Sequence, residues 1–273
     1  RTEAFLASNN RPAPLTVQIN TLKISVGAYI SMLEKAGISF DVHPWLEGCV
    51  ILGGGSVNTL PGFEEGLFYV QDAAARAAVE IAAPEAGMCV LDACSAPGGK
   101  SFASAIRMGN RGSIISSDIH EKKLRLIMNG AQRLGINIIS TRCADARCIA
   151  PDMEELYDLV IADVPCSGFG VIAKKPEIRW KKEEDIAAIP GIQLDILKSL
   201  AQRVRPGGTL LYSTCTVLHA ENESLVSAFL DIRKDYRLEP FSLGAISAPD
   251  GMYGFWPDRD GTDGFFAAVL ERM

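Results

Sequence analysis

Two cysteines follow apolar runs that read as neighbouring strands, and each stands where its run ends. Cys166 comes after the run 159–162 and Cys215 after the run 209–212. In an open parallel sheet the carboxyl ends of the strands form the ligand crevice, and neighbouring strands lie about 4.8 Å apart. We therefore expect the two thiols to share one pocket. This pairing indicates covalent chemistry, because a thiolate is a good nucleophile.

The chain that positions these thiols has 273 residues, which is enough for one large domain or two modest ones. Seven cysteines, an odd number, favour reduced thiols and a cytoplasmic protein. A net charge of −6 does not predict a nucleic-acid partner, so any basic surface must be local. We see no membrane span and no signal peptide. Because the chain starts without Met, we expect part of a longer protein.

The chain divides by pattern into two domains. Residues 1–66 predict a small α+β domain, with strands near 17–20 and 49–52 and a helix over 25–37. Segment 60–66 is expected to be the linker. Residues 67–273 alternate between strands and helices, which is typical of a Rossmann-like, mostly parallel sheet. Its last strand, 265–270, is expected to be an antiparallel edge.

A glycine-containing loop, residues 94–100, follows the first strand of the larger domain and opens a helix. Glycines let the backbone approach a ligand, and a helix N-terminus favours negative charge. Gly99, Lys100 and Ser101 match the end of the phosphate-binding loop motif, but Cys94 stands where that motif needs glycine. The dinucleotide fingerprint G-x-G-x-x-G is absent as well. The loop therefore disfavours ATP, GTP and nicotinamide cofactors.

Three aspartates stand at the ends of later strands, or just after them, and so at the same edge of the predicted sheet. Asp118 stands twenty residues after Gly98, where an acidic residue accepts hydrogen bonds from ribose hydroxyls. Asp145 follows the strand 137–141 and can reach an adenine amino group, and Asp163 ends the strand 157–163. A single aspartate is more simply a turn or cap residue, but several in register indicate a nucleotide-like ligand.

Several blocks, taken together, resemble the RsmB/NSUN-type (Sun/Nop2 family) RNA cytosine-5 methyltransferases, above all the bacterial ribosomal-RNA branch. They span nearly the whole chain and comprise residues 60–66, 70–73, 92–100, 163–168, 170–172, 175–180, 213–216, 221–223 and 263–266. The resemblance implies a methyltransferase sheet that uses S-adenosylmethionine, with one antiparallel strand, beside a small RNA-binding module that residues 1–66 could supply.

The resemblance also implies roles for the residues of the site. Asp118 holds the cofactor's ribose and Asp145 its adenine, while Asp163 lies between the cofactor and the target base. Cys215 is the nucleophile, and Cys166 helps to release the product. The methionine part of S-adenosylmethionine is wrapped by Cys94, Ser95, Ala96, Pro97, Gly98, Gly99 and Lys100.

Cytosine methylation at carbon 5 explains why thiols are needed. That carbon is too electron-poor to attack a methyl group, and a thiolate bonded to carbon 6 turns the ring into a nucleophilic enamine. Asp163 could hydrogen-bond the ring nitrogen and the exocyclic amine and so stabilise the developing charge. The base must leave any stack to reach Cys215, so we expect base flipping or a single-stranded target.

Segment 174–182 holds five basic residues and should rim the pocket. We expect RNA contacts there, with phosphates on the basic side chains and stacking on the aromatic ring, from Lys174, Lys175, Arg179 and Trp180. We expect ribosomal RNA as the partner, a monomer, no metal and no membrane. The alternatives are a transfer-RNA substrate, a non-catalytic RNA-binding scaffold, and Cys166 as the attacking thiol.

Overall fold

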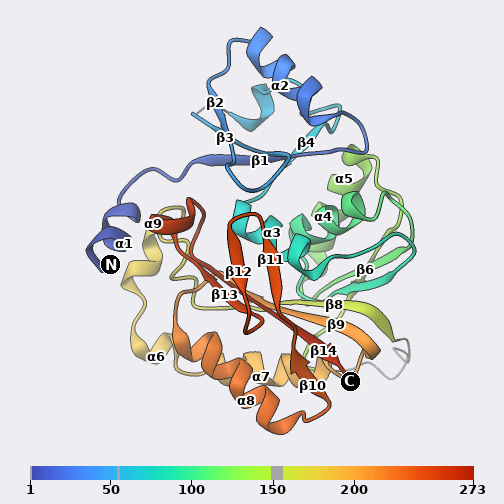
Figure 1. Ribbon diagram of the computed structural model, residues 1–273, viewed down its shortest axis with the longest axis vertical. Coiled ribbons are helices and arrows are strands. Elements are labelled where there is room, and N and C mark those ends of the chain that lie inside the picture. The colour runs from blue at the N-terminus through green and yellow to red at the C-terminus, as the bar shows by residue number, and fades with distance from the viewer. Residues whose placement is uncertain (1, 54–55, 149–155) are drawn as a thin grey trace.

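The computed structural model describes residues 2–53, 56–148 and 156–273, and Figure 1 shows a small sheet above a larger one. The N-terminal elements are α1 (Thr2–Ser8), β1 (Leu15–Ile19), α2 (Val26–Lys35), β2 (Phe40–Val42), β3 (Cys49–Leu52), the 3₁₀ helix η1 (Val57–Thr59) and β4 (Phe68–Val70). Their strands form an antiparallel sheet in the order β2-β3-β1-β4. The sheet thus takes in β4, which lies beyond residue 66.

Segment 60–66 is packed against the larger domain. The Asn20 side-chain amide donates to the carbonyl oxygens of Gly66 (2.9 Å) and Leu134 (2.8 Å). The Arg133 guanidinium lies over the Phe63 ring and donates to the Phe63 carbonyl. These contacts hold the small sheet against the C-terminal end of the helix that ends at Leu134.

The elements that follow the small sheet build the larger domain. Its elements are α3 (Ala73–Ala82), β5 (Cys89–Asp92), α4 (Gly99–Arg107), β6 (Ser113–Asp118), α5 (Glu121–Leu134), β7 (Ile139–Cys143), β8 (Tyr157–Asp163), η2 (Pro176–Trp180), α6 (Glu183–Ile186), α7 (Ile189–Leu200), β9 (Val204–Thr214), η3 (His219–Glu221), α8 (Glu223–Ile232), β10 (Tyr236–Leu238), β11 (Phe241–Leu243), β12 (Ile246–Ala248), β13 (Met252–Phe255), α9 (Pro257–Asp260) and β14 (Phe265–Arg272).

The main sheet has the order β10-β14-β9-β8-β5-β6-β7, and β13 also pairs with β14. Strands β5 to β9 run parallel, and β14 runs antiparallel to β9 and β10. This confirms the predicted fold class. The prediction that 265–270 is an edge strand was wrong, because β10 and β13 pair with the free side of β14.

Helices cover both faces of the main sheet (Figure 1). In β8, Leu159 and Ile161 pack into the core beneath α3, α4 and α5, whereas Val160 and Ala162 pack against α7 and α8. A strand buried on both faces reads as a continuous apolar run, which is why β8 was recognisable in the sequence. None of the helices in the described ranges has the length and apolar character that a transmembrane span requires.

Candidate active site

The carboxyl ends of the parallel strands open into a cavity of about 670 Å³. Its wall contains many of the residues that the sequence predicted for the site, drawn from the ends of β5, β6, β7, β8 and β9 and the segments after them. They are Cys94, Ala96, Asp118, Asp145, Asp163, Cys166, Lys175 and Cys215.

The two thiols lie side by side in this cavity, with their Sγ atoms 3.1 Å apart. A hydrogen bond with Cys166 lowers the pKa of Cys215 even though burial and the charge of Asp163 oppose this, and the charges of Lys100 and Lys175 also lower it. The same bond, together with burial, raises the pKa of Cys166 well above its usual value. The electrostatics therefore favour Cys215 as the thiolate and Cys166 as its proton-bearing partner.

A buried polar network behind the thiols joins the two turns. The hydroxyls of Ser167 and Thr216 are 2.7 Å apart, and the Ser167 N–H donates to the Glu221 carboxylate at 2.9 Å. The Gln193 side-chain amide donates to the same carboxylate (2.9 Å) and to the Pro165 carbonyl (3.0 Å). Sequence reasoning missed Gln193 and Glu221. The only signal for Glu221 was its place in the resembling block 221–223.

Backbone contacts complete the link between the turns. The Gly170 N–H donates to the Cys215 carbonyl (3.0 Å), and the Gly264 N–H donates to the Gly170 carbonyl (2.8 Å). A Cβ atom on Gly170 would lie 1.8 Å from the Gly264 carbonyl oxygen and 2.8 Å from that of Cys215. Only glycine permits this approach, which packs the start of β14 against both turns.

Asp163 is held from two sides. The Lys100 ammonium lies 2.7 Å from one carboxylate oxygen, and the Ser213 hydroxyl donates to the other at 2.8 Å. Lys100 also lies over the Phe265 ring, 4.9 Å from its centroid. Lys100, predicted as part of the cofactor loop, therefore also fixes the carboxylate that faces the thiols.

The other two predicted aspartates, Asp118 and Asp145, also line this cavity. Asp118 accepts hydrogen bonds from the His120 N–H (2.9 Å) and the Ala96 N–H (3.3 Å), and Asp145 pairs with Arg147 at 2.6 Å. Burial raises the pKa of the Cys94 thiol, which therefore stays neutral. The remaining part of the loop lines a second cavity of about 390 Å³, on which Ser95, Pro97, Gly99 and Lys100 lie together with Asp163. Gly98, at a φ of 113°, is the N-cap residue of α4.

The four residues predicted to contact RNA fall into different environments. Trp180 is 84% exposed. Lys175 lines the cavity, and the Arg179 guanidinium donates to the Asn9 carbonyl at 2.7 Å. The Lys174 ammonium is instead engaged by two carboxylates. In the described part of the chain, no three His, Cys, Asp or Glu side chains gather as a potential metal site.

Asp92, at the end of β5, is fully buried, and one of its oxygens accepts from Ser101 while the other has no partner among the described residues. Burial raises the pKa of Asp92 to about 7, against about 4 in an unfolded chain. Between about pH 4 and pH 7 the folded chain keeps a proton on Asp92 that the unfolded chain has lost. The contribution of Asp92 to the free energy of unfolding therefore falls as the pH rises to about 7.

We therefore expect that the Asp92→Asn protein does not lose stability in this way as the pH rises. Between pH 4 and pH 7 its melting temperature should rise relative to that of the unsubstituted protein, by about 2–4 °C for each kcal/mol of relief. Thermal unfolding followed by circular dichroism across this pH range measures the difference. Parallel curves for the two proteins would mean that Asp92 is ionised in the fold.

Comparison with known proteins agrees with this geometry. Residues 79–271 match the family model described as 16S rRNA methyltransferase RsmB/F. The chain belongs to this family. Residues 1–58 match a second model, described as the ferredoxin-like domain of RsmF/B-like methyltransferases. The RsmB/F assignment confirms the resemblance found in the sequence.

Relatives of this RsmB/F chain include named bacterial proteins. It is 36% identical to the Bacillus subtilis protein named probable ribosomal RNA small subunit methyltransferase B, over 96% of this chain and 60% of that protein. It is also 36% identical to ribosomal RNA small subunit methyltransferase B of Vibrio cholerae, over 99% of this chain and 62% of that protein. The chain thus spans less than two thirds of the length of these relatives.

A solved structure shares the arrangement of both domains. It is described as a methyltransferase homolog protein from Pyrococcus horikoshii, and it is 30% identical with a TM-score of 0.86. The match covers 99% of this chain and 90% of that one. The RsmB/F chain and this Pyrococcus horikoshii protein therefore share one overall fold.

Proposed function

We propose that this chain transfers a methyl group from S-adenosylmethionine to carbon 5 of a cytosine in ribosomal RNA. The observation that carries the proposal is the pair of thiols 3.1 Å apart in a cavity that Asp163 also lines. The name of the Vibrio cholerae relative supports ribosomal RNA as the substrate class.

The residues of the cavity fit this cofactor by their chemistry. Asp118 and Asp145 offer carboxylate oxygens for ribose hydroxyls and an adenine amino group, and the loop at Cys94 and Ala96 forms part of the cavity wall. When bound, S-adenosylmethionine supplies an electrophilic methyl group. The chain's own contribution is to hold the cofactor on one side of Asp163 and the thiols on the other.

The thiols carry the covalent steps on the base. The Cys215 thiolate forms a bond to carbon 6, and the electrons of the C5–C6 double bond make carbon 5 nucleophilic. Asp163, oriented by Lys100, accepts a hydrogen bond from the exocyclic amine. Once carbon 5 is methylated, its proton passes to a base, the electrons of the C5–H bond re-form the C5–C6 double bond, and the bond from Sγ to carbon 6 breaks so that Cys215 leaves as a thiolate. Cys166, hydrogen-bonded to Cys215, assists this release.

Exposed groups around the cavity suit an RNA strand. Lys175 and Lys181 line the cavity and suit phosphates, while Arg179 lies on the adjacent turn η2. Residues 1–66 are proposed as an accessory RNA-binding module. A cytoplasmic monomer is part of the same proposal.

Trp180 provides a direct test of the RNA contact. Stacking of a base on this exposed ring contributes about 1–3 kcal/mol, so Trp180→Ala should weaken RNA binding by roughly tenfold or more with little change in melting temperature. Filter binding at fixed salt measures the change. Ile232→Ala, at another exposed apolar side chain, is the matched control. Equal affinities for both variants would remove Trp180 from the interface.

Bisulfite mapping of RNA from cells with and without the protein tests the activity itself. We expect one or a few cytosines in ribosomal RNA to lose their 5-methyl group when the protein is removed. Loss confined to transfer RNA would correct the substrate class. No loss in either RNA class, with no binding of S-adenosylmethionine by calorimetry, would favour a non-catalytic scaffold.

A further inference from the structure

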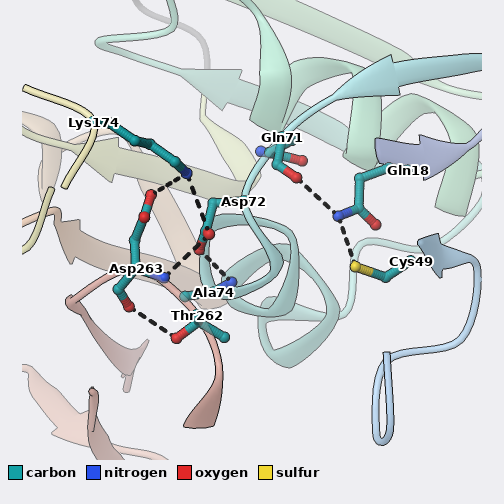
Figure 2. A network of polar contacts seen from close by, with 8 residues as sticks. All are labelled: Gln18, Cys49, Gln71, Asp72, Ala74, Lys174, Thr262 and Asp263. Atoms are coloured by element: carbon teal, nitrogen blue, oxygen red, sulfur yellow. Dashed lines mark hydrogen bonds and ion pairs between the residues drawn. The ribbon is translucent and has the colours of Figure 1, made fainter. Parts of the chain in front are cut away.

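Three charged side chains, Asp72, Lys174 and Asp263, form a cluster that does not line the cavity of the thiols (Figure 2). The Lys174 ammonium lies 2.6 Å from the Asp263 carboxylate and 3.4 Å from that of Asp72. The Asp263 backbone N–H donates to the Asp72 carboxylate at 3.1 Å. Two carboxylates therefore share one ammonium.

The members of the cluster come from three separate parts of the chain. Asp72 is the N-cap of α3, where its second oxygen accepts from the Ala74 N–H at 2.9 Å. Asp263 directly precedes β14, and Lys174 lies in segment 164–175, which follows β8 and carries Cys166. Lys174 is thus the point at which this segment is tied to α3 and β14.

Charge and burial explain why Lys174 is needed there. The side chains of Asp72 and Asp263 are only 12% and 14% exposed, and that of Lys174 is 34% exposed. Burial, and then the charge of Asp72, raise the pKa of Asp263 to about 7. The ammonium of Lys174 offsets this repulsion between the acids, and an ammonium engaged in this way is poorly placed to bind a phosphate as well.

The segment reaches the active site on both sides of Lys174. Its neighbour Lys175 lines the cavity and lowers the pKa of Cys215. Toward the other end, Gly170 bonds to the Cys215 carbonyl and to Gly264, the residue after Asp263. A displacement of Lys174 would therefore also displace the charged group of Lys175 and the turn that carries Cys166.

We infer that Asp72, Lys174 and Asp263 act as a clamp that holds segment 164–175 so that Cys166 and Lys175 face Cys215. Lys174 is then a positioning residue and not an RNA contact. The clamp also borders the small sheet, since the Gln18 side chain on β1 donates to the Cys49 thiol at 3.2 Å and to the Gln71 carbonyl, beside Asp72, at 3.0 Å (Figure 2). The effect on turnover rests on the proposed function, whereas the effect on the thiols does not.

The test compares Lys174→Met with Lys174→Arg, Asp263→Asn and a control, Lys234→Met, which breaks an exposed Lys–Asp pair remote from the site. Two readouts are taken on each full-length protein. One is the kcat and KM of methyl transfer to ribosomal RNA. The other is the rate at which iodoacetamide alkylates Cys166 and Cys215, resolved by peptide mass spectrometry, which needs no methyltransferase activity.

We expect Lys174→Met and Asp263→Asn each to lower kcat about tenfold with a change in KM for RNA below twofold. The two substitutions combined should be little worse than either alone, because they break one contact. Alkylation of Cys166 should become about threefold faster or more, since its turn is loosened. Lys174→Arg should retain most of the activity, and Lys234→Met should match the unsubstituted protein.

A different pattern overturns the inference. If Lys174→Met raises KM and lowers the salt dependence of RNA binding by about one phosphate contact, with unchanged kcat and alkylation, Lys174 binds RNA. If the unsubstituted protein methylates no RNA, the proposed function fails, and the alkylation rates alone decide on the clamp. Unchanged alkylation in both Lys174→Met and Asp263→Asn would then refute it.

Discussion

Replacement of Cys215 by alanine should lower methyl transfer at least about a thousandfold, equivalent to about 4 kcal/mol of transition-state stabilisation. Without this thiolate no bond to carbon 6 forms, and carbon 5 stays unreactive. Cys166→Ala should also stop turnover, but for another reason. Its Cys215 remains able to attack, so the covalent RNA–protein adduct should accumulate.

The two outcomes are separated by a radiolabelled methyl-transfer assay and by the mobility of the RNA adduct in a denaturing gel. Cys143→Ala is the matched control, because Cys143 is exposed and does not line the cavity of the thiols. An adduct that forms in Cys215→Ala but not in Cys166→Ala would reverse the roles of the two thiols.

Gly170→Ala should be the most damaging of the conservative substitutions in this region. Its added methyl group would collide with the backbone carbonyls of Gly264 and Cys215, neither of which can rotate away. We expect the free energy of unfolding to fall by about 3 kcal/mol or more. Activity should fall at least tenfold even at a temperature where the variant is folded, because the Cys215 turn loses its contact with the Cys166 turn.

Urea denaturation and the methyl-transfer assay measure the two effects. Gly191→Ala is the control, since a methyl group there meets no atom within 4 Å and the position is helical. Alanine should stabilise that helix slightly, by up to about 1 kcal/mol. If Gly170→Ala unfolds at the same urea concentration as the unsubstituted protein, the close approach between β14 and the two turns does not exist in solution.

Long elements with one dominant signal were predictable from the sequence. The helix Glu121–Leu134 has an apolar face that repeats at helical spacing, and Gly135 ends it in a left-handed conformation. Strand β8 was predicted with its observed bounds. The short strands β4 and β10 to β13 were missed, since three or four residues carry too little pattern and each depends on its sheet partner.

The sequence by itself determined the chemistry available to this protein: which strands end in polar turns, that Cys166 and Cys215 stand in two of those turns, and that aspartates follow the neighbouring strands. These are local properties, because strand ends and turns depend on residues close together in the chain. Only the tertiary structure decided which groups touch. It placed the two sulfur atoms 3.1 Å apart, set Lys100 against Asp163, and enclosed Lys174 between Asp72 and Asp263. Contacts of this kind join residues up to about 190 positions apart, and their distances depend on the packing of the whole sheet, which no local pattern encodes.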